Sequence, residues 1–105
     1  MIPLKPKEKV RKRVAREANL EGRLIRDIER AGGICWKWTS PGRRGVPDRI
    51  VIVNGAITFA ELKSAKGGVD IAQRECAEAI AAAGGRVLFV NPANYTASLR
   101  TMLNA

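Results

Sequence analysis

The chain has 105 residues, which is room for one domain with a modest hydrophobic core. Its 19 Lys and Arg residues outnumber its 10 Asp and Glu residues, which gives a net charge of +9, and it contains no histidine. The lack of histidine excludes Ser–His and Cys–His nucleophilic pairs and imidazole ligands for zinc or haem. Catalysis in this chain would therefore rely on carboxylates, lysines and a metal ion bound by oxygen atoms.

The net charge predicts a polyanionic partner, and nucleic acid is the expected one. No apolar run is long enough to span a membrane, and the basic N-terminus lacks the apolar segment of a signal peptide. We therefore expect a cytoplasmic protein with no membrane partner and no organic cofactor. Cys35 and Cys76 form no C-x-x-C motif and are expected to be reduced and buried.

The positive charge is concentrated at the N-terminus. Residues 1–16 carry seven basic residues and one acid, a net of +6 (7 − 1), and are expected to form a basic arm that could be helical. We interpret the arm as a phosphate-contacting segment, with a solvated tail as the alternative. Residues 17–105 are expected to form a single domain. The arm residues expected to bind DNA are Lys9, Lys12, Arg13 and Arg16.

Seven elements are expected in the order α-β-β-β-α-β-α, which is typical of an α/β fold with a mixed sheet flanked by helices. A first helix is predicted over residues 6–31, although Asn19 and Gly22 could divide it. The expected strands are residues 34–39, 48–53, 56–63 and 86–90, and the later helices run from 70 to about 84 and from 93 to 103. The apolar stripe of the first helix consists of Val10, Val14, Leu24 and Ile28.

Asn54-Gly55, between two apolar strands, predicts a two-residue hairpin loop. In that register Val53 pairs with Ala56, and Asp48 lies opposite Glu61. Lys63 lies two residues beyond Glu61 and so shares its face of the strand. The sequence therefore predicts two carboxylates and an ammonium group at one end of the hairpin.

Two carboxylates that face each other across a sheet repel, and a divalent cation bound between them removes this repulsion. Oxygen ligands suit Mg²⁺ or Mn²⁺, which can activate a water molecule and polarise a phosphodiester. Lys63 would then orient the water or stabilise developing charge. The alternative is a pair of surface salt bridges, one between Lys63 and Glu61 and the other between Arg49 and Asp48.

Four segments over residues 17–92 resemble the VRR-NUC (virus-type replication-repair nuclease) domain, which belongs to the PD-(D/E)xK nuclease superfamily. The segments are Gly45-Val46-Pro47-Asp48, Phe59-Ala60-Glu61-Leu62-Lys63, Gln73 and Gly85-x-x-Leu88-Phe89-Val90. The resemblance implies a restriction-endonuclease-like core with the element order given above. The chain is similar in length to stand-alone phage members of this family. This resemblance implies that the protein acts in a bacterial cell or a phage-infected host.

By this resemblance, Asp48 and Glu61 are expected to bind the metal and Lys63 to be the catalytic lysine. The backbone carbonyl of Leu62 is expected to complete the metal shell. Gln73 matches a helix glutamine near the family's site, and Asp70 to Gln73 equally fits a helix-capping box.

The family also has an acidic residue on its first helix. Glu17 fits its E-x-x-I-E-x-x-L pattern best, and Glu21 is the alternative. Salt bridges to Arg13 and neighbouring arginines would explain either acid without a catalytic role.

Three loop cations are expected to contact phosphates that flank the scissile one, or else to be solvated loop charges. They are Arg43, Arg44 and Lys66. Trp36 and Trp38 alternate with Lys37 and so share one strand face, which we interpret as core or dimer interface rather than as a base-stacking platform.

The resemblance implies structure-selective cleavage of branched DNA, four-way (Holliday) junctions above all, in DNA repair. A junction of near two-fold symmetry requires two active sites, and one chain of this length carries one, so a homodimer is expected. A non-catalytic basic nucleic-acid-binding protein and a sequence-specific restriction endonuclease are the alternatives. The first leaves the Asp48–Glu61–Lys63 register unexplained, and no target-recognition domain is visible for the second.

Overall fold

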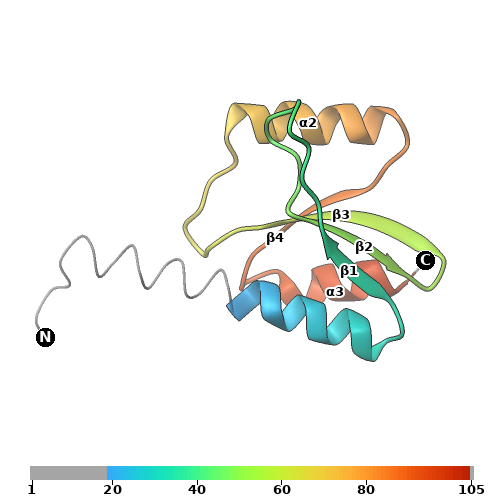
Figure 1. The fold of residues 1–105 in the computed structure, drawn as a ribbon. Coiled ribbons are helices and arrows are strands. Elements are labelled where there is room, and N and C mark those ends of the chain that lie inside the picture. The colour runs from blue at the N-terminus through green and yellow to red at the C-terminus, as the bar shows by residue number, and fades with distance from the viewer. Residues whose placement is uncertain (1–18, 105) are drawn as a thin grey trace, which may run out of the picture.

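A four-stranded mixed sheet in the order β1-β2-β3-β4 forms the centre of the fold (Figure 1). The computed structural model describes residues 19–104, in which residues 19–30 are helical. The other elements are β1 (Ile34–Lys37), β2 (Arg49–Val53), β3 (Ala56–Leu62), α2 (Ile71–Ala82), β4 (Val87–Val90) and α3 (Tyr95–Leu103). This confirms the α/β class and the predicted order. The basic arm lies outside the described residues, as do Val10 and Val14.

The β2–β3 hairpin has the predicted register. Val53 pairs with Ala56 and the ladder continues to Arg49 opposite Ala60, all antiparallel. The turn residues Asn54 and Gly55 have φ values of 52° and 79°, which is the conformation that a two-residue hairpin loop of right-handed twist requires. β1 pairs antiparallel with β2, whereas β4 pairs parallel with β3 after the crossover through α2.

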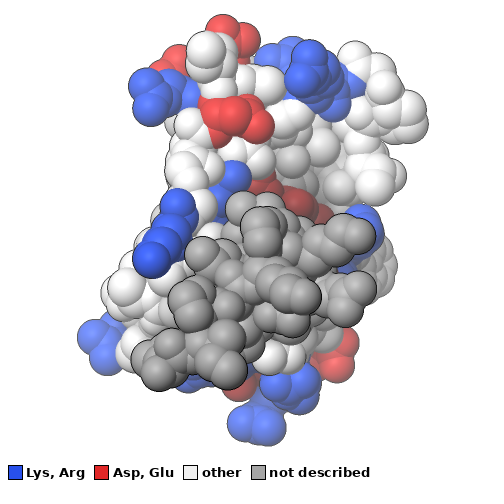
Figure 2. Space-filling model, turned by 90° about the vertical axis from the view of Figure 1, so that its left-hand side faces the viewer, with Lys and Arg blue, Asp and Glu red and all other residues white. Residues whose placement is uncertain are grey.

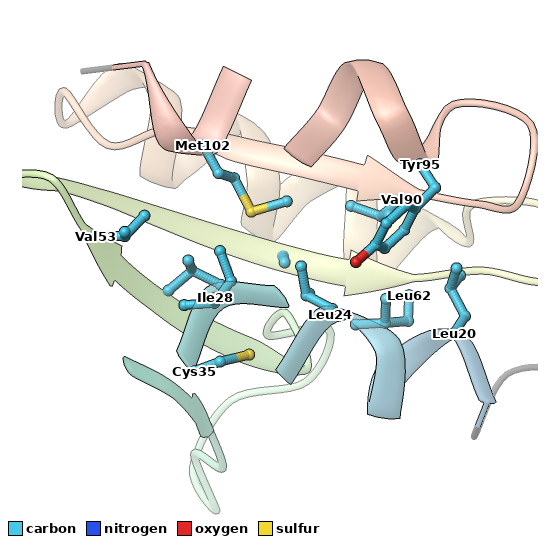
Figure 3. Close-up of a cluster of buried hydrophobic side chains, with 11 residues drawn as sticks. Leu20, Leu24, Ile28, Cys35, Val53, Leu62, Val90, Tyr95 and Met102 are labelled. Carbon is cyan, nitrogen blue, oxygen red and sulfur yellow. The ribbon is translucent and has the colours of Figure 1, made fainter. Parts of the chain in front are cut away.

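The hydrophobic core lies between one face of the sheet and two helices, residues 19–30 and α3 (Figure 3). Leu24 and Ile28 of the predicted stripe are fully buried there, and Gly22 does not interrupt the helix. The side chains of the cluster are Leu20, Leu24, Ile28, Cys35, Val51, Val53, Ala60, Leu62, Val90, Tyr95 and Met102. α2 lies on the opposite face of the sheet (Figure 1).

A polar contact ties the two core helices together. The hydroxyl of Tyr95 donates a hydrogen bond of 2.6 Å to Asp27, and the guanidinium of Arg23 lies 4.1 Å from the centre of the Tyr95 ring. Both cysteines are buried and free, as predicted, and burial raises the pKa of the Cys35 thiol to about 11. Within residues 19–104, no helix is long and apolar enough to cross a membrane.

The tryptophans do not enter the core. Trp36 is 64% exposed, and Trp38 lies beyond the end of β1, its ring centre 5.1 Å from that of Phe59. Of the two predicted roles, core or dimer interface, the core is therefore wrong for Trp36, and the dimer interface stays a prediction. The physical reason is that Trp36 pairs with Ile50, on the sheet face opposite the two core helices, and α2 packs on this face at the β4 side.

Candidate active site

Asp48 and Glu61 lie together where β2 begins and β3 ends. The last pair of the ladder is Arg49 with Ala60, and the backbone N–H of Leu62 donates a hydrogen bond of 2.9 Å to Asp48 Oδ2. This bond holds the Asp48 carboxylate against the strand that carries Glu61. Glu61 is only 3% exposed, so it is not a surface acid.

The Glu61 carboxyl is strongly perturbed. Burial, followed by a hydrogen bond with Asp48 and the Asp48 charge, raises the pKa of Glu61 to about 8, and Lys63 offsets part of this effect. A buried carboxyl beside a second carboxyl is costly to ionise unless a cation is bound nearby. Perturbation of this kind, from burial together with a specific charged neighbour, is typical of functional sites.

Gln73, on the first turn of α2, joins Lys63 to Glu61. Its side-chain oxygen accepts a hydrogen bond of 2.5 Å from Lys63 Nζ, and its Nε2 donates one of 2.7 Å to Glu61 Oε2. Both side chains thus reach one amide group, which agrees with the prediction that Lys63 and Glu61 share a face of the strand. The salt bridge between Lys63 and Glu61, which was the alternative to a metal site, does not occur among residues 19–104.

The orientation of the Gln73 amide is set by Asp70. The Asp70 N–H donates to Gln73 Oε1 at 3.2 Å, and the Asp70 carboxylate accepts from the Gln73 N–H at 2.8 Å. This is the predicted capping box, and it coexists with the contacts to Lys63 and Glu61. Since two donors require an oxygen on one side of the amide, its nitrogen must face Glu61.

Glu21, the alternative acid of the first helix, makes a different contact. Its carboxylate pairs with Arg49 at 3.3 Å, and Arg49 also donates to the carbonyl of Cys35 at 3.4 Å. Glu21 is therefore engaged with β2, and Arg49 does not pair with Asp48. Glu17 lies outside the described residues.

The loop cations are accessible. Arg43 and Arg44, between β1 and β2, and Lys66, between β3 and α2, are all exposed. Figure 2 shows the side on which α2 begins, with acidic and basic side chains together in a hollow beneath the upper part of the molecule. Lys9, Lys12, Arg13 and Arg16 lie outside the described residues.

The donor set suits a small, hard cation. Asp48 and Glu61 offer adjacent carboxylate oxygens, which Mg²⁺ and Mn²⁺ prefer. Within residues 19–104 there is no third Asp, Glu, Cys or His beside them that would complete a group of three. Any further ligands would be backbone oxygens, water or a residue outside this range.

Two features of the site were missed in the sequence. The Ser64 hydroxyl, next to Lys63, is buried without a hydrogen-bond partner among the described residues, and no pattern in the sequence signals it. Gly45 packs directly on the first turn of α2. The Gly-x-Pro-Asp turn draws attention to Gly45, but the partner element can be identified only from the fold.

Comparisons with known proteins bear on the fold and on the class of activity. A solved structure described as "VRR_NUC domain" superposes with a TM-score of 0.73 and 27% sequence identity, over 82% of this chain and 95% of that one. A curated protein named "Putative nuclease p44", from Acyrthosiphon pisum secondary endosymbiont phage 1, is 49% identical over 53 residues. That match covers 50% of this chain and spans 57% of the phage protein. No family model matches the chain.

Proposed function

We propose that this chain, which has the fold of a VRR-NUC domain, is a metal-dependent DNA endonuclease that hydrolyses phosphodiester bonds. The observation that carries the proposal is the convergence of Asp48, Glu61 and Lys63, the last two joined through Gln73. The solved VRR_NUC domain and the phage protein named as a nuclease support the same class of activity.

Asp48 and Glu61 would hold Mg²⁺ or Mn²⁺, with the Leu62 carbonyl as a further ligand. These residues fit such a cation because Glu61 is buried beside Asp48 and its pKa is raised to about 8. A bound cation would offset the cost of ionising Glu61 there. When bound, the metal supplies Lewis-acid polarisation of the phosphodiester and a water of lowered pKa.

Lys63 contributes the positive charge of the protein itself. Its Nζ is held by Gln73, which also holds Glu61, so the ammonium group is aligned with the carboxylate pair. From that position Lys63 would orient the attacking water or stabilise negative charge on the phosphate. Because Gln73 accepts only one of the three ammonium hydrogens, donors remain for substrate or water.

The preferred substrate is branched DNA, with four-way junctions the leading candidate. The family resemblance supports this choice, and the exposed Arg43, Arg44 and Lys66 supply cations for the flanking phosphates. Symmetric cleavage of such a junction needs two active sites and therefore a homodimer. The open apolar face of the sheet is the proposed contact, since Trp36, Ile52 and Ile57 are 64%, 37% and 53% exposed.

The substrate class is tested with three labelled DNAs: a synthetic four-way junction, a flap and a linear duplex. Each is incubated with the protein and Mg²⁺, Mn²⁺ or EDTA. Cleavage of the junction in both metals, weaker cleavage of the duplex and none in EDTA is the expected result. Binding without cleavage in every metal would favour the non-catalytic nucleic-acid-binding protein, for which the net charge of +9 is the supporting observation.

A further inference from the structure

Gly45 lies near the end of the loop between β1 and β2, and its backbone touches the first turn of α2. In Figure 1 this loop runs up to α2 before it returns to the sheet. A methyl group at Gly45 would overlap the carbonyl group of Ala72 and come within 2.7 Å of the Gln73 backbone nitrogen. The contact is closer than a side chain permits, so the two backbones can meet only through glycine.

The conformation of Gly45 imposes the same restriction independently. Its φ is +80°, in the left-handed region that side chains with a Cβ rarely adopt. Gly42, in the same loop, has no such φ, and a methyl group added there would meet nothing within 4 Å. The demand for glycine is thus specific to the position that touches Gln73.

We propose that Gly45 is a positioning residue that seats the β1–β2 loop against α2 and, through Gln73, sets the placement of Lys63 and Glu61. The inference rests on the proposed function. Among residues 19–104, Gln73 connects these contacts: its backbone lies beside Gly45 together with that of Ala72, and its amide meets Lys63 and Glu61. The same loop carries Arg43 and Arg44, so the contact of Gly45 with α2 also sets how far these two arginines lie from Lys63 and Glu61.

The test compares three single substitutions. Gly45→Ala introduces both the close contact and the strained φ. Gly32→Ala introduces the strained φ alone, because Gly32 has a φ of +85° and open space around it, and Gly42→Ala introduces neither. We expect single-turnover cleavage at saturating DNA to fall on the order of 10²-fold in Gly45→Ala and to stay close to the wild-type rate in both controls. Equal rates in Gly45→Ala and Gly32→Ala would overturn the proposal.

Action through Gln73 is tested by a double-mutant cycle. In a Gln73→Ala background, Gly45→Ala should cause no further loss of rate, because the group that it displaces is already absent. If the two substitutions instead reduce the cleavage rate by independent factors that multiply, Gly45 acts through a group other than Gln73. Gly45→Asn is the second variant, since Asn tolerates positive φ better than other residues with a Cβ but makes the same close contact.

A readout without DNA separates this inference from the proposed function. The side-chain amide of Gln73 is followed by NMR in 15N-labelled protein. Its resonances should shift in Gly45→Ala and stay in place in Gly42→Ala and Gly32→Ala, whether or not the wild type cleaves DNA. Unchanged Gln73 side-chain resonances in Gly45→Ala would contradict the positioning role even if the nuclease activity is confirmed.

Discussion

Lys63 donates a hydrogen bond of 2.5 Å to the side-chain oxygen of Gln73, which comes from the next element along the chain. The same amide donates to Glu61 at 2.7 Å. One side chain of α2 thus aligns the Lys63 ammonium group and the Glu61 carboxyl group at the end of β3. These contacts support the proposal that Gln73 belongs to the candidate site as well as capping α2.

Gln73→Ala should therefore slow cleavage by about 10- to 10²-fold, because Lys63 and Glu61 lose their shared partner. Gln73→Glu should be at least as slow, since a carboxylate accepts from Lys63 but cannot donate to Glu61. Single-turnover rates at saturating DNA measure the effect. Gln73→Ala at the wild-type rate would show that the bridge has no catalytic role.

Divalent cations should stabilise the folded protein. At concentrations 10 to 100 times the dissociation constant, Mg²⁺ or Mn²⁺ should raise the free energy of unfolding by about 1.4 to 2.7 kcal/mol. The increase should vanish in Asp48→Asn and in Glu61→Gln and persist in Glu78→Gln, because Glu78 is exposed on α2. Thermal unfolding with and without EDTA measures it. Stabilisation of equal size in Glu61→Gln would place the cation elsewhere.

The stability of the metal-free protein should depend on pH through Glu61. Burial and Asp48 raise the pKa of Glu61 from 4.5 to about 8, so between these values the folded state holds a proton that the unfolded state has lost. The contribution of Glu61 to stability is fully present below pH 4.5 and is lost as the pH rises through about 8.

Chemical unfolding in EDTA at several pH values tests this dependence. Glu61→Gln should remove it, so that the variant gains stability relative to wild type as the pH rises from 5 to about 9. A constant difference between the two proteins across this range would show that Glu61 is not perturbed. Added Mg²⁺ should stabilise wild type more at the high end, where no proton competes for the carboxylate.

The hairpin and the carboxylate pair follow from local rules in the sequence. Asn54-Gly55 specifies the turn, the turn specifies the register, and the register brings Asp48 beside Glu61. The capping box of α2 is equally local, and it places Gln73 in the first turn of the helix. For these reasons, the hairpin, the carboxylate pair and the position of Gln73 could be predicted from the sequence.

Features that depend on how distant elements pack were not predictable. Alternation places Trp36 on one face of β1 but does not tell which face the helices cover. The pairing of Glu21 with Arg49 joins residues 28 positions apart and depends on the docking of the first helix. The packing of Gly45 on α2 likewise exists only once the loop and the helix are both in place.

The open sheet face offers a test of the proposed homodimer. Ile57→Lys places a charge within the apolar patch and should convert a dimer to a monomer in analytical ultracentrifugation. Ile71→Lys is the matched control, because Ile71 is 77% exposed but lies on α2 and outside the patch. A monomeric wild-type protein under nuclease conditions would rule out the dimer.

Tyr95→Phe should lower the stability of the protein without changing its cleavage rate. Loss of the hydrogen bond to Asp27 should lower the free energy of unfolding by about 1–3 kcal/mol, because the acceptor is charged and partly buried. The cleavage rate at a temperature where the variant is folded should not change, since Tyr95 lies in the core on the other face of the sheet from Gln73. A parallel loss of activity would indicate that α3 takes part in the site.

Lys63 is proposed to act in catalysis at a site formed with Asp48 and Glu61. This proposal is tested most directly by comparing wild type with Lys63→Ala on one four-way junction in Mg²⁺, with binding and cleavage measured in the same samples. We expect Lys63→Ala to bind the junction with nearly wild-type affinity and to cleave it at least about 10²-fold more slowly. Equal cleavage by the two proteins would show that Lys63 takes no part in catalysis, and no cleavage by either despite binding would show that the chain is not a nuclease.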